Sequence, residues 1–300
     1  MKILLNAALS LAFTFSALQL NAQNSKVSDL FVQDELKLIS SQFSFTEGCS
    51  ADKAGNVFFT DQPNDKLWKY GTDGKLSVFL DKTGRANGTF FDKKGNLIIC
   101  ADEKGEFWSV DKKGKPTIFI KDFKGKQLNG PNDLWIDAAG NIFFTDPYYQ
   151  RDYWTRTKPE LPSQSVYFIP KGTKNIVLAA DSLNQPNGIV GTPDGKYLYI
   201  ADAGANKFYR YDIGKNGSLT NKKLLINRGA DGITLDDKGN IYLSGGRAVA
   251  IFTPAGEKIG EIKVPEGTSN VCFGGKDKNI LFITAQKSVY TIPVKAKGVE

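Results

Sequence analysis

One repeated segment constrains this chain more than any other feature. A short apolar run leads into an Asp-x-x-Gly-Asn turn, and a second apolar run follows. The copies span residues 49–61, 89–102, 134–146, 189–202, 233–245 and, in degenerate form with Lys278 at the glycine position, 271–284. Glycine between two apolar runs is typical of a β-hairpin, because it supplies the positive φ that the turn needs. The spacing of the copies is about the period of one propeller blade.

Further strand candidates lie between the copies, for example residues 66–70 with 77–80 and residues 207–211 with 223–226. Each repeat therefore contains four strands. The sequence predicts an all-β chain, a six-bladed β-propeller with four-stranded antiparallel blades. Blade six lacks an outer strand after residues 288–294, and residues 35–39 (ELKLI) could supply it. We therefore expect the ring to be closed by an N-terminal strand, which protects an otherwise open sheet edge.

A second regularity appears eight residues before each turn position, where the side chain is always acidic or an amide. These six positions, called the ring residues below, are Glu47, Asn87, Asn132, Asn187, Asp231 and Asn270. The equal offset assigns them one structural position, the start of the innermost strand of each blade. We expect six oxygen-bearing groups to meet at one mouth of the central channel. The alternative is that Asx-Gly merely forms a turn entering each strand, but turn chemistry does not favour Glu47.

Two carboxylates and several amide oxygens are hard ligands suited to a divalent cation. We expect one such ion, with Ca²⁺ the first choice and Mg²⁺, Mn²⁺ or Zn²⁺ as alternatives. Zinc is the least favoured, because the chain has no histidine and no clustered cysteines. The absence of histidine also excludes a Ser-His-Asp triad. An empty, water-filled channel is the alternative to a cation site.

Residues 1–22 are typical of a signal peptide, with Lys2 followed by an apolar stretch. We expect residues 23–300 to form a single propeller domain, with the closing strand within 23–46. Export predicts a secreted protein, most simply in a bacterial periplasm, with no membrane contact after cleavage; a retained anchor is the alternative.

The net charge of +7 is spread over turns without a nucleic-acid motif, so we expect no nucleic-acid partner. The three cysteines, an odd number, are interpreted as small buried residues. The oligomeric state stays open.

At the ring residues the chain resembles a known family. It is similar to gluconolactonases, to regucalcin (senescence marker protein) and to squid-type diisopropyl fluorophosphatase, and most of all to the bacterial gluconolactonase branch. The resemblance covers most of residues 40–295 and is carried by FTEG (45–48), NGPND (129–133), FTDPY (144–148), PNG (186–188) and GADG (229–232). It implies a divalent ion, commonly Ca²⁺, held by Glu47, Asn132, Asn187 and Asp231. Regucalcin-like members carry a substrate-binding Arg two residues before the blade-three Asn, and this chain has Gly130 there.

The expected activity is hydrolysis of a small-molecule lactone, with an aldonolactone such as glucono-1,5-lactone as the substrate. The ion would polarise the carbonyl, and a carboxylate would activate water. Asp231 is our first candidate for the catalytic base and Glu47 the second. The long segment 147–165 is rich in aromatic and basic residues and could cover the mouth. We expect substrate contacts from Arg85, Asn87, Asp133, Tyr148 and Trp154. Two alternatives stay open: a phosphotriesterase with Asp231 as nucleophile, and a non-catalytic propeller binding module with a structural Ca²⁺.

Overall fold

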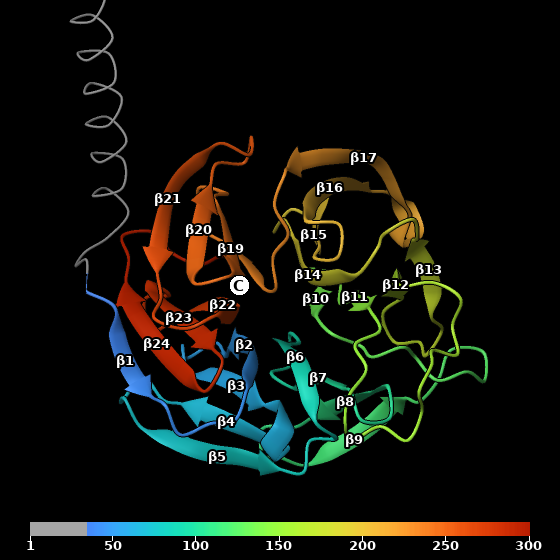
Figure 1. The fold of residues 1–300 in the computed structure, drawn as a ribbon, viewed down its shortest axis with the longest axis horizontal. Coiled ribbons are helices and arrows are strands. Elements are labelled where there is room, and N and C mark those ends of the chain that lie inside the picture. Colours follow the sequence, from blue (N-terminus) through green and yellow to red (C-terminus); the bar gives the residue numbers. More distant parts are fainter. Residues whose placement is uncertain (1–34) are drawn as a thin grey trace, which may run out of the picture.

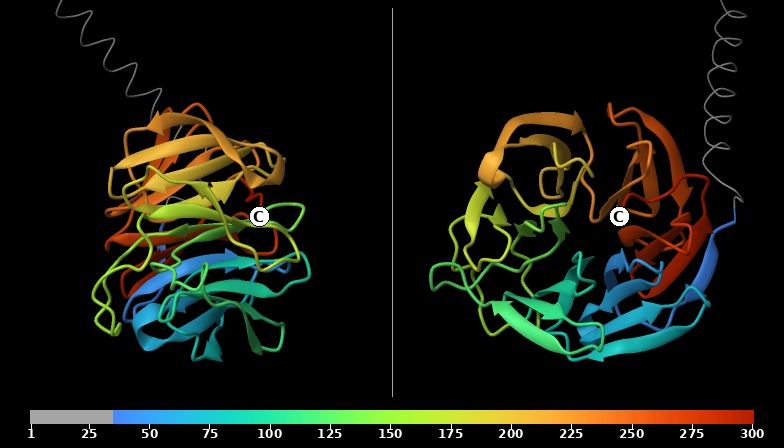
Figure 2. Two further views of the ribbon diagram at one scale, coloured as in Figure 1. Left: turned by 90° about the vertical axis from the view of Figure 1, so that its right-hand side faces the viewer. Right: turned by 180° about the vertical axis from the view of Figure 1, so that it is seen from behind.

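The computed structural model describes residues 35–300 as six four-stranded antiparallel sheets arranged in a ring (Figure 1). Figure 2 shows the same ring from its edge and from behind. The predicted six-bladed propeller is confirmed. The predicted signal peptide lies outside the described residues. Among residues 35–300, no helix has both the length and the apolar composition needed to cross a membrane.

Each blade runs from an inner strand at the channel to an outer strand at the rim. Blades one to three are β2 (Thr46–Ala51), β3 (Val57–Asp61), β4 (Lys66–Tyr70) and β5 (Leu76–Asp81); β6 (Ala86–Phe91), β7 (Leu97–Ala101), β8 (Glu106–Val110) and β9 (Pro116–Ile120); and β10 (Leu134–Ile136), β11 (Ile142–Asp146), β12 (Ser165–Ile169) and β13 (Val177–Ala180).

Blades four to six follow in the same order. They are β14 (Pro186–Gly191), β15 (Tyr197–Asp202), β16 (Lys207–Ile213) and β17 (Leu219–Ile226); β18 (Ile233–Leu235), β19 (Ile241–Gly245), β20 (Ala248–Phe252) and β21 (Lys258–Lys263); and β22 (Thr268–Gly274), β23 (Ile280–Ala285) and β24 (Ser288–Pro293) with β1 (Lys37–Ser40). Two single-turn 3₁₀ helices interrupt the loops, η1 (Gln62–Asn64) and η2 (Lys215–Gly217).

The repeated Asp-x-x-Gly-Asn segments form the turns between inner and second strands. In blade one, Oδ1 of Asp52 accepts hydrogen bonds of 2.9 Å from the amides of Ala54 and Asn56. Gly55, the glycine of this turn, has a φ of 86°. In the degenerate sixth copy Lys278 adopts a φ of 55°, which costs a non-glycine residue free energy. The turn geometry therefore persists where the glycine does not.

The ring is closed as the sequence predicts. Strand β1 pairs antiparallel with β24 and becomes the outer strand of blade six. Blades six and one are also joined near the channel. The Ser269 hydroxyl donates to the carbonyl of Thr46 at 2.6 Å, and the Thr46 hydroxyl donates to the carbonyl of Ser288 at 3.1 Å. Blade six is therefore fixed at both its inner and its outer edge.

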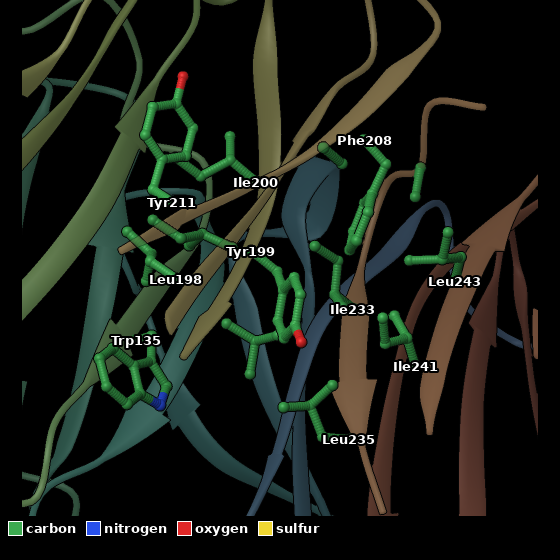
Figure 3. Packing of buried hydrophobic residues seen from close by; sticks show 14 of the residues in the cluster. Trp135, Leu198, Tyr199, Ile200, Phe208, Tyr211, Ile233, Leu235, Ile241 and Leu243 are labelled. Atoms are coloured by element: carbon green, nitrogen blue, oxygen red, sulfur yellow. The ribbon is translucent and has the colours of Figure 1, made fainter. Parts of the chain in front are cut away.

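The hydrophobic core lies between neighbouring blades. In the largest cluster, Trp135 of blade three, Tyr199 of blade four and Leu235 of blade five are all buried (Figure 3). Burying one such side chain contributes about 1.5–3 kcal/mol. All three cysteines are buried and unpaired, and the Cys49 thiol contacts that of Cys272 between blades one and six. Burial raises the pKa of the Cys49 thiol, so the interpretation as small core residues is confirmed.

The substitution Thr46→Val tests the closure between blades six and one. The hydroxyl donates to the buried carbonyl of Ser288 at 3.1 Å and accepts from the amide of Ala285 at 3.2 Å. Valine keeps the shape and leaves these groups unsatisfied, so we expect the free energy of unfolding to fall by about 1–3 kcal/mol. Denaturant unfolding measures the change, and Thr117→Val on an exposed outer strand is the control. An equal effect in both variants would contradict this account.

Candidate functional site

The six ring residues stand at the start of the six innermost strands. Glu47 lies in β2, Asn87 in β6, Asn187 in β14 and Asn270 in β22, while Asn132 and Asp231 precede β10 and β18. The exposed fractions are 5% for Glu47, 2% for Asn87, 5% for Asn132, 6% for Asn187 and 7% for Asn270. Asp231 is half-buried. Polar side chains of this kind are usually exposed, so their burial at one mouth needs a reason.

The glycine that follows a ring residue is required by the neighbouring blade. A Cβ on Gly88 would lie 2.4 Å from the carbonyl oxygen of Asn132, and one on Gly188 would lie 2.5 Å from the carbonyl oxygen of Asp231. Neither glycine has a positive φ. Close approach of adjacent inner strands, and not a turn, therefore explains these two Asx-Gly pairs. Blade three has Asp133 at this position, and its Oδ2 accepts from the amide of Ile189 in the next blade at 3.3 Å.

Hydroxyl groups on second strands fix the ring backbone from outside. Thr60 donates to the carbonyl of Asn87 at 3.0 Å, and Thr145 donates to the carbonyl of Asn187 at 2.7 Å. Each bond crosses from one blade to the next. Both threonines belong to the repeated Phe-Thr-Asp segment, so this motif sets the position of ring residues in the following blade.

The carboxyl groups of the site lie close enough to perturb one another. Burial raises the pKa of Glu47 well above its ordinary value, and the charge of Asp231 raises it further. Burial raises the pKa of Asp231 to about 7, against the opposing effect of a hydrogen bond from the Asn187 amide. The pKa of Asp133 is likewise raised to about 7 by burial, with Asp231 adding to the shift. A positive charge placed among these groups would therefore be strongly favoured.

The donor set fits a hard divalent cation. Within residues 35–300 no group of three or more His, Cys, Asp or Glu is arranged as a metal cluster. The candidate set combines only two carboxylates, Glu47 and Asp231, with the amides of Asn132 and Asn187, and all its oxygens are hard donors. The side-chain amide of Asn187 donates from Nδ2 to Tyr149 Oη at 3.2 Å, and it also donates a hydrogen bond to the Asp231 carboxylate. The Oδ1 atom of Asn187 is therefore the one available to a cation.

A cavity of about 330 Å³ opens beside these groups. Its walls include Tyr149, Asn187, Arg228 and Asp231, together with the small residues Ala203, Gly229, Ala230, Gly245 and Gly246 and the side chain of Asn206. A larger cavity of about 610 Å³ lies at the opposite mouth, among the hairpin turns and the Val299–Glu300 end of the chain. No ring residue lines that larger cavity. We place the chemistry at the smaller cavity, because it contains a carboxylate and an amide of the ring.

The long segment between β11 and β12 is held in place by Asp102, which is 1% exposed. The Asp102 carboxylate accepts from Arg151 Nε at 3.3 Å and from the Tyr153 hydroxyl, and its carbonyl accepts from Trp154 Nε1 at 3.2 Å. This anchorage sets Tyr149 beside Asn187. Asp102 follows the last residue of its blade's second strand. In blades one, three and four the aspartate at the end of the second strand instead accepts hydrogen bonds from two backbone amides of the loop that leads into its own blade. The loop that leads into blade two is bound instead by Asp65, which lies between β3 and β4 of blade one.

None of the five residues expected to contact substrate lines the smaller cavity. Trp154 is buried against Asp102, and the Tyr148 ring packs 5.5 Å from it. Arg85 donates to the carbonyl of Pro63 at 2.6 Å and its guanidinium lies 4.4 Å from the Tyr153 ring. Asn87 and Asp133 are buried in the ring. Their assignment to substrate contact stays a prediction, whereas the metal-ligand candidates Asn187 and Asp231 do line the cavity.

Comparison with known proteins assigns the family. The family described as SMP-30/gluconolactonase/LRE-like region matches residues 45–287. The chain belongs to this family. It is 30% identical to a gluconolactonase of Zymomonas mobilis over 90% of this chain and 84% of that protein. It is 29% identical to the diisopropyl-fluorophosphatase of Loligo vulgaris over 56% of this chain and 58% of that enzyme. The solved structure of a gluconolactonase from Xanthomonas campestris superposes with a TM-score of 0.81 at 27% identity, covering 86% and 89% of the two chains.

The sequence analysis did not assign Arg228 or Asp102 to the site, and it placed Tyr149 in the segment that could cover the mouth without including it among the expected substrate contacts. Tyr149 and Arg228 line the cavity, and Asp102 anchors the loop above it. Arg228 stands three residues before Asp231, so proximity to a ring residue was the available signal. Asp102 ends the second repeat as Asp61 and Asp146 end theirs, and nothing in the sequence distinguishes its different partners.

The substitution Asp102→Asn tests the anchorage of the long loop. It removes the charge that Arg151 faces and weakens the bond to Tyr153, so we expect a loss of about 1–3 kcal/mol in the free energy of unfolding. Hydrogen exchange should increase in residues 147–164 before it increases elsewhere. Asp81→Asn, which breaks an exposed pair with Lys66 at 3.0 Å, is the control and should change the free energy of unfolding far less than Asp102→Asn. Unchanged exchange in the loop would refute the anchorage.

Proposed function

We propose that this chain is a divalent-cation-dependent hydrolase that opens a sugar lactone, with an aldonolactone such as glucono-1,5-lactone as its substrate class. The observation that carries the proposal is the juxtaposition of Asp231, Asn187 and Tyr149 around one cavity beside buried Glu47. The family relatives named gluconolactonase support hydrolysis of a lactone.

Glu47, Asn132, Asn187 and Asp231 would hold the cation, with Ca²⁺ the first candidate. When bound, the ion supplies a Lewis acid that polarises the lactone carbonyl and balances negative charge on its oxygen. The raised pKa values of Glu47 and Asp231 indicate that these carboxylates lack a compensating charge of their own.

Asp231 is our candidate for the general base, because it is the carboxylate that lines the cavity. The Asp231 carboxylate would accept a proton from water and return it to the leaving alcohol, and a bound cation would keep this carboxylate ionised by lowering its pKa below that of the cation-free site. The Tyr149 hydroxyl and the Asn206 side chain can bond the hydroxyls of a sugar ring, which suits a polyhydroxylated substrate. Glu47, deeper in the ring, would serve the cation.

Phosphotriester hydrolysis is the second candidate, favoured by the similarity to a diisopropyl-fluorophosphatase. In that reaction Asp231 would attack phosphorus and displace the leaving group, and water would then hydrolyse the phosphoryl-enzyme to restore the carboxylate. We also propose that the chain is exported, since residues 1–22 have the pattern of a signal peptide.

The activity is tested by proton release from glucono-1,5-lactone after chelation and after adding back Ca²⁺, Mg²⁺, Mn²⁺ or Zn²⁺ separately. We expect one ion to restore turnover, and Asp231→Asn to lower kcat/KM by at least about a hundredfold because the base is lost. Asp181→Asn, an exposed carboxylate in the loop before β14, is the matched control. Turnover of a fluorophosphate ester but of no lactone would favour the second candidate. No turnover with any ion, together with no cation binding, would leave a binding module.

The pH dependence of stability gives a separate test of cation binding. Asp231 ionises near 3.8 in the unfolded chain and near 7 in the folded one. Between these pH values the folded state keeps a proton that the unfolded state has released, so the free energy of unfolding falls as pH rises through this window and stays low above it. After chelation we therefore expect a lower Tm at about pH 8 than at about pH 5, and a larger increase in Tm on adding Ca²⁺ at about pH 8. An equal increase at both pH values would argue against carboxylate ligation.

A further inference from the structure

Arg228 is a basic residue in the wall of the smaller cavity, and the mechanism above does not use it. It lies in the loop between β17 and β18, three residues before Asp231. Among the ten residues that line the cavity, Arg228 and Asp231 are the charged ones. The two face one cavity without forming an ion pair, since within residues 35–300 no carboxylate lies within 4.0 Å of the Arg228 guanidinium.

The guanidinium is held at one corner only. Its Nη2 donates to the carbonyl of Gly245 at 2.8 Å, and Gly245 itself lines the cavity. A guanidinium carries five N–H donors, and the hydrogen bonds of the described residues use one of them on Arg228. The loop itself is fixed, because the amide of Gly229 donates to Asn206 Oδ1 at 2.8 Å. Arg228 therefore offers a positioned fork with unused donors.

The wall around this fork is built from residues with small side chains. Ala203, Gly229, Ala230, Gly245 and Gly246 leave the space beside the guanidinium open, and a Cβ built on Gly246 meets no atom within 4 Å. A substrate group can thus approach Arg228 without displacing a side chain. The planar fork of arginine matches a carboxylate by two parallel hydrogen bonds.

The charges of the site favour an anionic partner for this fork. Glu47 and Asp231 would direct their two negative charges at the divalent cation, whereas the Asp133 carboxylate accepts from the amides of Leu134 and Ile189 within the wall. The Arg151 charge is matched by Asp102 at 3.3 Å. The Glu261 carboxylate, outside this wall, also interacts with the Arg228 charge, but among the residues that line the cavity no carboxylate is left to pair with Arg228 once a cation is held by Asp231. A neutral sugar lactone would leave Arg228 without such a partner, whereas a lactone with a carboxylate at the far end of its carbon chain would supply one.

We propose that Arg228 is a specificity residue that binds the terminal carboxylate of the substrate, and that the preferred lactones are derived from sugar diacids (aldarolactones) or carry an equivalent carboxylate. This inference rests on the proposed lactone hydrolysis and names its substrate class. Arg228 takes no part in the proton transfer. It raises the affinity for one end of the substrate and so directs the lactone carbonyl toward Asp231.

Two lactones that differ at a single carbon test the proposal. Glucono-1,4-lactone ends in a hydroxymethyl group and glucaro-1,4-lactone in a carboxylate. We expect the cation-loaded protein to prefer the glucarolactone in kcat/KM, and Arg228→Gln to lower this preference by on the order of tenfold or more, chiefly through KM. Arg228→Lys should keep part of the preference, since the charge is retained without the fork. Arg247→Gln is the matched control, an exposed arginine two residues after Gly245 at the same mouth.

A binding measurement separates this inference from the proposed activity. Lactams of the same two sugars resist ring opening, and their affinities can be measured by isothermal titration calorimetry. Tighter binding of the carboxylated lactam that is lost in Arg228→Gln and kept in Arg247→Gln would support the role of Arg228, even if no lactone is hydrolysed. Equal affinities for the two lactams, no binding of either, or the same loss in both arginine variants would overturn it. Failure of the hydrolysis assay alone would overturn the proposed function.

Discussion

The close approach of the six innermost strands is the constraint on which the rest of the structure depends. Gly88 and Gly188 have no space for a Cβ, because the backbone of the next blade occupies it. This proximity brings Glu47, Asn187 and Asp231 to one mouth, where they lose most of their contact with water. The repeat thus builds both the fold and the site. Blade packing creates the crowding, and the crowding perturbs the carboxyl groups.

The crowding has a compensating set of hydrogen bonds. Thr60 and Thr145 donate across blade boundaries to the carbonyls of Asn87 and Asn187. A buried carbonyl without a partner would cost about 1–3 kcal/mol, so these hydroxyls allow the ring backbone to be buried. Blade two departs from the pattern at its final aspartate. Because Asp65 has taken over the loop into that blade, Asp102 is available to hold the long segment of blade three. The aspartate at the end of the second strand therefore has a different role in blade two, where Asp102 anchors the segment between β11 and β12.

The repeat made much of this fold predictable. The recurrence of the turns at about the period of one blade predicted six blades, and an unpaired edge in blade six predicted the closing strand, which the structure confirms as β1 paired with β24. The ring was predictable for the same reason, since one offset from each turn defines one position. Residues outside the repeat were not. Arg228 and Tyr149 reach the cavity through loop conformations, and loop conformation depends on contacts such as that of Gly229 with Asn206, which no periodicity reveals.

Asp133, for which substrate contact stays a prediction, shows how the neighbouring blade decides where a side chain of the ring is directed. Asp133 follows a ring residue and occupies the place that glycine holds in four other blades. The same steric argument that forbids a Cβ at Gly88 and Gly188 implies that a side chain here must turn into the wall, and its carboxylate accepts from the amides of Leu134 and Ile189. Its charge nevertheless acts on the site, because it raises the pKa of Glu47. Asp133 therefore adds to the negative potential that a cation would relieve without lying at the wall of the cavity. The fold concentrates uncompensated carboxylates at this mouth at a cost to its own stability, and a bound cation would offset that cost.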